Sequence, residues 1–178
     1  DMMSYGNGHH HGNPNMGTAR YWSGPCFMAL LPDHPLFPAW RNHMALYGEY
    51  NISSQVAPGG GYFEYGAAYH MHGFARATNG VPGLQSAGAD NAERLITNYV
   101  APDWQYYMNL LTPFDPRWKS RMIPGMANSQ PGNTENFAEA AGTVAKSAPQ
   151  LAANLLWAWQ ANGAKGGYNS ALAPANIN

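Results

Sequence analysis

One stretch of the chain, residues 58–74, constrains the fold more than any other because a triple-glycine turn leads directly into an aromatic segment. It has the sequence PGGGYFEYGAAYHMHGF. Proline followed by glycines favours a tight turn, and the positions after the turn place apolar side chains and His70 on one helical face. The sequence therefore predicts a helix over residues 62–78 that is mostly buried or faces a cleft.

The remaining sequence predicts an all-α fold. No strand-like alternation of useful length occurs, whereas helical periodicity recurs between segments rich in glycine and proline. Besides the segment at 62–78, we expect helices over residues 17–31, 38–55, 91–99, 103–111, 136–146 and 148–161, with loops at 56–61, 81–89 and 113–131.

The chain has 178 residues, which is enough for one domain with a hydrophobic core. We expect a single helical domain over residues 1–178, in which helical hairpins occupy residues 17–163. A His/Asn loop over residues 1–16 precedes them and a tail over residues 164–178 follows. The chain begins at Asp1 without an initiator methionine, and we expect it to be a segment of a longer polypeptide.

Composition excludes several classes of function. The net charge of −1 provides no electrostatic footprint for nucleic acid. No run of 18 apolar residues is present, so we expect no membrane span. The single cysteine, Cys26, rules out an internal disulfide framework. Low charge with many aromatic and amide side chains is typical of a secreted or periplasmic carbohydrate-active protein.

The tyrosines and histidines of the predicted 62–78 helix are the first candidates for chemistry. Tyr69 lies one helical turn from Tyr65 and from His72, so the three side chains can line one cleft, with His70 beside them. Tyrosine and histidine can transfer protons when neighbouring charges tune their pKa values. The alternative is an aromatic helix face packed in a core, with its hydroxyls bonded to backbone groups.

A second candidate is the loop over residues 8–15, with the sequence GHHHGNPN. Its histidines and asparagines can donate hydrogen bonds to an anionic group. They can also bind a metal ion, although no Cys partner or HExxH pattern supports a metal, and we expect none. A third interpretation is a surface loop whose side chains cap neighbouring turns.

Charged side chains provide the remaining candidates. Glu64, in the first turn of its predicted helix, suits either the helix dipole or acid–base chemistry. A paired-carboxylate glycosidase needs a second acid, for which the candidates are Glu49, Asp103, Asp115 and Glu135. The cations that suit a carboxylate or sulfate substrate are Arg41, Arg76, Arg94, Arg117, Lys119 and Arg121. Tryptophans that can stack on sugars or fill the core are Trp22, Trp40, Trp104, Trp118, Trp157 and Trp159.

Three stretches together resemble the toroid domain of heparinase II/III-like polysaccharide lyases and their alginate-lyase relatives. GHHHGNPN resembles the Asn/His loop of those enzymes, and PGGGYFEYGAAYH is similar to their Asp-Gly-Gly, aromatic, Glu, Tyr-His segment. PGNTENF followed by LLWAWQANG resembles the Gly-Asp-Thr/Ser loop and the Trp-containing helix near the end of the toroid. The chain departs from the family at Gly59 and Asn133, where the family has aspartates, and no histidine follows His72.

The resemblance implies an incomplete (α/α) toroid that needs the remainder of its polypeptide, or partner chains, for completion. It implies β-elimination of an acidic, uronic-acid-containing polysaccharide without a cofactor, with Tyr69 and His70 moving protons. It places the group that neutralises the uronate carboxylate among His10, His11 and Asn13. As substrate-binding residues we expect Arg41, Glu64, Tyr65, His72, Arg76 and Asn133. The alternatives are a glycoside hydrolase on the same toroid and a non-catalytic carbohydrate-binding or assembly protein.

Overall fold

The computed structural model describes residues 24, 25, 28, 30–62, 70, 74, 80–126 and 130–164. These residues are predominantly helical, and the β-structure among them consists of isolated bridges only. The all-α expectation is therefore confirmed for the part of the chain that the structure describes. None of the helices found there is both long enough and apolar enough to cross a membrane.

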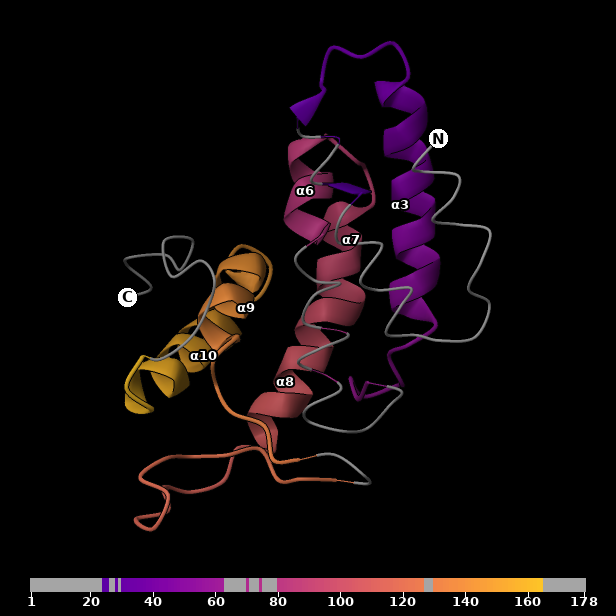
Figure 1. Cartoon of the computed structure of the whole chain (residues 1–178). Helices are drawn as coiled ribbons and strands as arrows, with labels where there is room; N and C mark the ends of the chain where they lie inside the picture. Colours follow the sequence, from indigo (N-terminus) through magenta and orange to yellow (C-terminus); the bar gives the residue numbers. More distant parts are fainter. Residues whose placement is uncertain are drawn as a thin grey trace.

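A continuous helical rod occupies the middle of the fold (Figure 1). It consists of α7 (Ala92–Leu95), the π-helical η1 (Ile96–Val100) and α8 (Ala101–Asn109). On one side of the rod lies α3 (Phe37–Ser53), and on the other lies the hairpin of α9 (Phe137–Val144) and α10 (Pro149–Ala161). The hydrophobic core is formed by the facing sides of these elements.

The continuity of the rod corrects the prediction of separate helices over residues 91–99 and 103–111. A proline such as Pro102 usually interrupts a helix, since it lacks an N–H and collides with the carbonyl of the preceding turn. Here the turn before it is π-helical, and the N–H of Ala101 donates to the carbonyl of Ile96, five residues back. The wider turn accommodates the proline without ending the helix.

The predicted loop over residues 81–89 is also wrong in its first part, because α6 (Gly80–Ser86) is helical. Val81 and Leu84 are three residues apart on one face of α6, and both are fully buried. Pro82 lies in the first turn, where a missing N–H costs little. Burial of two apolar side chains thus outweighs the poor helix propensity of this segment.

The other helices agree with their sequence patterns. α3, α9 and α10 lie within three residues of the predicted ends at 38–55, 136–146 and 148–161. A proline occupies the first turn of both α3 and α10, where its fixed φ favours helix initiation. Between α8 and α9 the described residues are irregular, as expected for a proline-rich segment.

The glycine turn packs directly against the rod. Gly59 and Gly60 have φ values of 96° and 99°, a region that disfavours side chains. After the turn, Tyr62 forms an isolated bridge with Val56, so it is not the first helical residue as expected. Of the remaining residues of the predicted 62–78 helix, the structure describes His70 and Phe74, which are both helical and fully buried.

Replacing Gly60 by alanine is expected to lower the free energy of unfolding by about 2 kcal/mol. A Cβ at this position would collide with the backbone carbonyl of Pro102 at the start of α8, in addition to straining the positive φ. Gly59→Ala is the matched control, because its φ is nearly the same but a Cβ there meets no atom within 4 Å. It is expected to cost about 1 kcal/mol. Urea unfolding of both variants gives the comparison, and equal losses would contradict close packing of the turn on α8.

Candidate functional site

The candidate site is a buried pair formed by His70 and Asp103. The imidazole Nε2 lies 2.6 Å from Oδ2 of the carboxylate, and both side chains are inaccessible to solvent. His70 comes from the segment after the glycine turn, whereas Asp103 lies in the first turn of α8. At this distance the two groups are joined by a hydrogen bond, in which either Nε2 or Oδ2 carries the proton.

Four aromatic rings enclose the imidazole. Tyr107 stacks on it, with ring centroids 3.6 Å apart, and Trp104 contacts it edge-on at 4.8 Å. Phe74 and Tyr62 lie at 5.7 and 6.2 Å. Asp103 and Tyr107 are one helical turn apart on α8, so the carboxylate and the stacking ring lie on the same helical face. This aromatic cage excludes water and fixes the orientation of the imidazole.

Burial controls the electrostatics of the pair. Loss of hydration raises the pKa of Asp103 to about 6, although the charge of His70 and its hydrogen bond partly oppose this shift. Burial also raises the pKa of the Tyr107 phenol, and the neighbouring Asp103 carboxylate adds to the effect. The Tyr107 hydroxyl therefore keeps its proton at neutral pH, so it can both donate and accept a hydrogen bond.

The cluster contains buried polar atoms for which the described residues provide no hydrogen bond. Within the part of the chain that the structure describes, no hydrogen-bond partner is found for four buried atoms: Nδ1 of His70, Oδ1 of Asp103, Nε1 of Trp104 and the hydroxyl of Tyr107. Purely structural cores seldom contain so many such atoms in one place, because each costs free energy. This concentration of buried polar atoms around His70 and Asp103 makes the cluster the best candidate for a functional site among the described residues.

The raised pKa of Asp103 predicts a pH dependence of stability. The folded protein retains the carboxyl proton up to about pH 6, whereas the unfolded chain loses it near the ordinary value of 3.8. Between these two values the folded state binds more protons, so the stability contributed by Asp103 is fully present below about pH 4 and decreases as the pH rises to about 6.

Thermal unfolding of the wild type and of Asp103→Asn between pH 4 and pH 8 measures this effect, since the variant removes one titrating group. The Tm of the wild type minus the Tm of Asp103→Asn is expected to decrease as the pH rises to about 6 and to remain constant above that pH. An increase in this Tm difference over the same pH range would contradict the prediction, because it would show that the fold stabilises the ionised carboxylate.

The structure describes three of the site residues predicted from the sequence. His70 is at the centre of the cluster. Arg41 is partly buried on α3, and Asn133 is exposed before α9, where its side-chain oxygen accepts a hydrogen bond from the Glu135 N–H at 3.0 Å. Among the described residues, neither Arg41 nor Asn133 forms a hydrogen bond or an ion pair with His70. The other predicted site residues lie outside the described part of the chain: His10, His11, Asn13, Glu64, Tyr65, Tyr69, His72 and Arg76.

The candidate acids have separate partners in the structure. Glu49 pairs with Arg94 at 2.6 Å and Asp115 with Arg117 at 2.7 Å, both near the surface. Asp103 alone of the four candidates is buried against a histidine. The described residues contain no group of three or more His, Cys, Asp or Glu side chains that could hold a metal ion, and the histidines at positions 9–11 lie outside them.

Sequence reasoning identified His70 but not the rest of the cluster. The sequence predicts Asp103 only as a helix start or a second acid and Trp104 only as a tryptophan that stacks on sugars or fills the core. It predicts Tyr107 only as part of the aromatic-rich helix that begins at Asp103. The available signal is a lone carboxylate one turn before a tyrosine in an otherwise uncharged stretch, since such a carboxylate needs a partner when it is buried. That signal does not name the partner.

The chain was also compared with known proteins. No family model matches it, and neither a curated protein nor a solved structure does. The evidence for function is therefore the chemistry of the site together with the sequence resemblance.

Proposed function

We propose that this chain is a helical domain of a polysaccharide lyase that cleaves a uronic-acid-containing glycan by β-elimination. The observation that carries the proposal is the buried His70–Asp103 pair inside an aromatic cage. It anchors the segment that carries Tyr69, the residue next to His70 in the chain. A histidine oriented by a buried carboxylate is a common device for placing proton-transfer groups.

In this reaction a base removes the proton from the carbon that bears the carboxylate, and the bond between C4 and the glycosidic oxygen then breaks. The leaving oxygen takes up a proton, and a C4–C5 double bond remains in the product. Tyr69 is the proposed proton carrier. His10, His11 or Asn13 would neutralise the uronate carboxylate, where negative charge develops. His70 is fully buried, so we assign it a positioning role and not direct contact with the sugar.

The helical hairpins, of which α9–α10 is one, would belong to an incomplete (α/α) toroid completed by further chain or by partner chains. Adjacent side chains on a helix point about 100° apart. On the helix expected over residues 62–78, an inward His70 is therefore compatible with a Tyr69 that faces a cleft. The substrate contacts would come from Arg41, Glu64, Tyr65, His72, Arg76 and Asn133. We expect a secreted or periplasmic location, where such polymers occur.

The test is incubation of the protein with alginate, heparan sulfate and pectin, followed by ultraviolet absorbance of the 4,5-unsaturated product. A rise in absorbance with at least one polymer is expected. New reducing ends from a neutral glycan, with no rise for any uronate polymer, would assign the protein to the glycoside hydrolases.

One observation favours a second candidate, a non-catalytic carbohydrate-binding protein. Large aromatic side chains are exposed near the irregular segment before α9: Phe114, Trp118 and Trp157 have exposed fractions of 51%, 68% and 50%. Exposed aromatic faces can cover the apolar face of a sugar ring without any chemistry. Binding of a polymer with no cleavage of any kind would support this candidate over the lyase.

A further inference from the structure

A short hairpin before α9 presents a tryptophan on a rigid support. Backbone bonding between Asp115 and Ser120 closes the hairpin, with the N–H of Asp115 donating to the Ser120 carbonyl at 3.0 Å. The Asp115 carboxylate accepts bonds from the backbone N–H of Arg117 at 2.9 Å and from its guanidinium at 2.7 Å. Trp118 follows at the tip. Because these bonds already order the hairpin, binding through Trp118 would cost little additional entropy.

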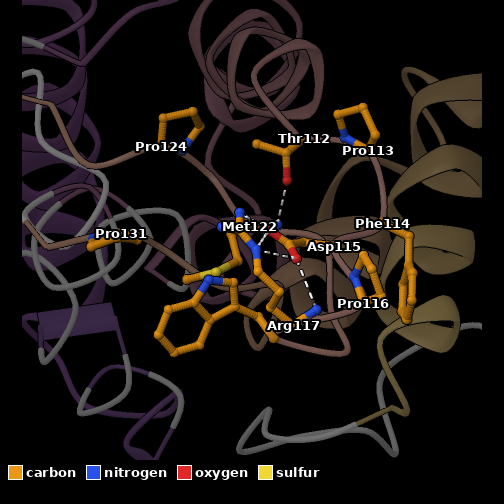
Figure 2. A pocket seen from close by; sticks show the side chains of 10 residues that line it. Thr112, Pro113, Phe114, Asp115, Pro116, Arg117, Met122, Pro124 and Pro131 are labelled. Carbon is orange, nitrogen blue, oxygen red and sulfur yellow. Dashed lines mark hydrogen bonds and ion pairs between the residues drawn. The ribbon is translucent and has the colours of Figure 1, made fainter.

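A hollow of about 620 Å³ adjoins this hairpin, which is within the range of small-molecule sites. Its walls are mainly apolar, formed by prolines with Phe114, Trp118 and Met122. Figure 2 shows Phe114 and Pro116 on one side and Pro124 and Pro131 on the other, with the Asp115–Arg117 pair between them. The hollow therefore combines apolar walls with an ion pair, of which the Arg117 side chain is largely exposed, an arrangement that suits a ring with polar substituents.

A second aromatic side chain borders the same face. The guanidinium carbon of Arg121 lies 5.1 Å from the ring centre of Trp157 on α10. Reciprocal bonds of 2.9 Å between the Arg121 backbone and the Asn162 side chain, at the end of α10, hold the arginine in place. Arg121 also contacts the carbonyl of Thr112, which lines the hollow. The face thus joins the hairpin to α10.

The charge of this face differs from that of the whole chain. Along residues 112–124 the charged residues are Arg117, Lys119, Arg121 and Asp115, so this segment carries a net charge of +2 in a chain of net charge −1. Cations beside exposed aromatic rings complement a carboxylated or sulfated sugar. Single-stranded nucleic acid also uses such rings, but it requires a longer positive track than two excess charges provide.

We infer that this face, defined by residues 112–124 with Pro131 and Trp157, is a binding subsite for an acidic polysaccharide, separate from the His70–Asp103 cluster. The inference deepens the proposed function and rests on it for the choice of polymer. The subsite is exposed whereas His70 and Asp103 are fully buried, so the two share no side chain. It would hold the polymer at a distance from the reacting sugar.

The test is calorimetric titration with alginate in a Tyr69→Phe background, so that the polymer is not consumed. Trp118→Ala is expected to weaken binding about tenfold. Tyr50→Ala is the matched control, because Tyr50 is an aromatic residue on α3 with an exposed fraction of 74%, and it is expected to leave the affinity unchanged. Equal affinity of Trp118→Ala and its background protein would overturn the inference.

A second variant tests the cation without disturbing the fold. Lys119 has a φ of 51°, so Lys119→Gly removes the charge while suiting the backbone conformation. It is expected to weaken alginate binding about threefold at low salt and to reduce the salt dependence of binding. No change in the salt dependence would contradict the role of Lys119.

Further measurements distinguish an acidic polysaccharide from other ligands of this face, and they test the subsite independently of the proposed lyase activity. Tighter binding of a single-stranded oligonucleotide, equally tight binding of neutral dextran, or self-association lost in Trp118→Ala on sedimentation would each overturn it. Cleavage of uronate polymers by the wild type, with alginate binding unaffected by Trp118→Ala, would refute the subsite alone. Alginate binding that depends on Trp118, without cleavage by the wild type, would support the subsite and refute the lyase.

Discussion

Replacement of Tyr69 by phenylalanine is expected to lower the rate of β-elimination by about 10²–10⁴-fold. The change removes the hydroxyl that we propose carries the proton and keeps the aromatic ring. Because other groups would neutralise the uronate carboxylate, the loss is expected in kcat and not in KM. Initial rates of absorbance increase over a range of alginate concentrations separate the two parameters.

Tyr50→Phe is the matched control for this measurement. It removes a hydroxyl from an exposed tyrosine on α3 and is expected to leave kcat and KM as in the wild type. An unchanged kcat in Tyr69→Phe, in a protein that does cleave alginate, would assign proton transfer to another residue.

Asp103→Ala is expected to lower the free energy of unfolding by about 3–5 kcal/mol. The change leaves the imidazole of His70 fully buried without its partner at 2.6 Å. It also opens a cavity beneath the ring of Tyr107, which stacks on His70. Urea unfolding followed by tryptophan fluorescence measures the loss, since Trp104 lies within the cluster.

Two variants separate this effect from a general loss of charge. Asp103→Asn retains an oxygen that can accept a bond from His70, so the expected loss is smaller, about 1–2 kcal/mol. Asp33→Ala removes an exposed carboxylate and is expected to change stability by less than about 0.5 kcal/mol. Equal losses for Asp103→Ala and Asp33→Ala would contradict a buried, partnered carboxylate.

Much of the helical framework was predictable because its signals are local. The periodicity of apolar residues predicts α3 and α10 within three residues of their observed ends, and the structure places a proline in the first turn of each helix. Two of the predictions that failed concern structure that depends on tertiary contacts. α6 forms because Val81 and Leu84 are buried, and the central rod passes Pro102 because the preceding turn is π-helical. Helix propensity alone predicts neither the burial of these side chains nor the π-helical turn.

The candidate site also has features that local sequence signals predict and features that depend on tertiary contacts. Residues 58–74, with their glycines and their run of aromatic side chains, predict a turn that leads into a mostly buried segment, and the three residues of that segment that the structure describes, Tyr62, His70 and Phe74, are buried. The sequence also placed His70 among the candidate residues and narrowed its role to chemistry or core packing. These conclusions require only backbone preferences and side-chain spacing.

Only the tertiary structure paired His70 with Asp103, which lies 33 residues further along the chain. Packing of the glycine turn against Pro102 brings the two segments together, and the aromatic cage then removes the water that would otherwise hold the carboxyl pKa low. Partner choice and desolvation are properties of the packed core, and a one-dimensional pattern carries no information about which distant side chain fills the space.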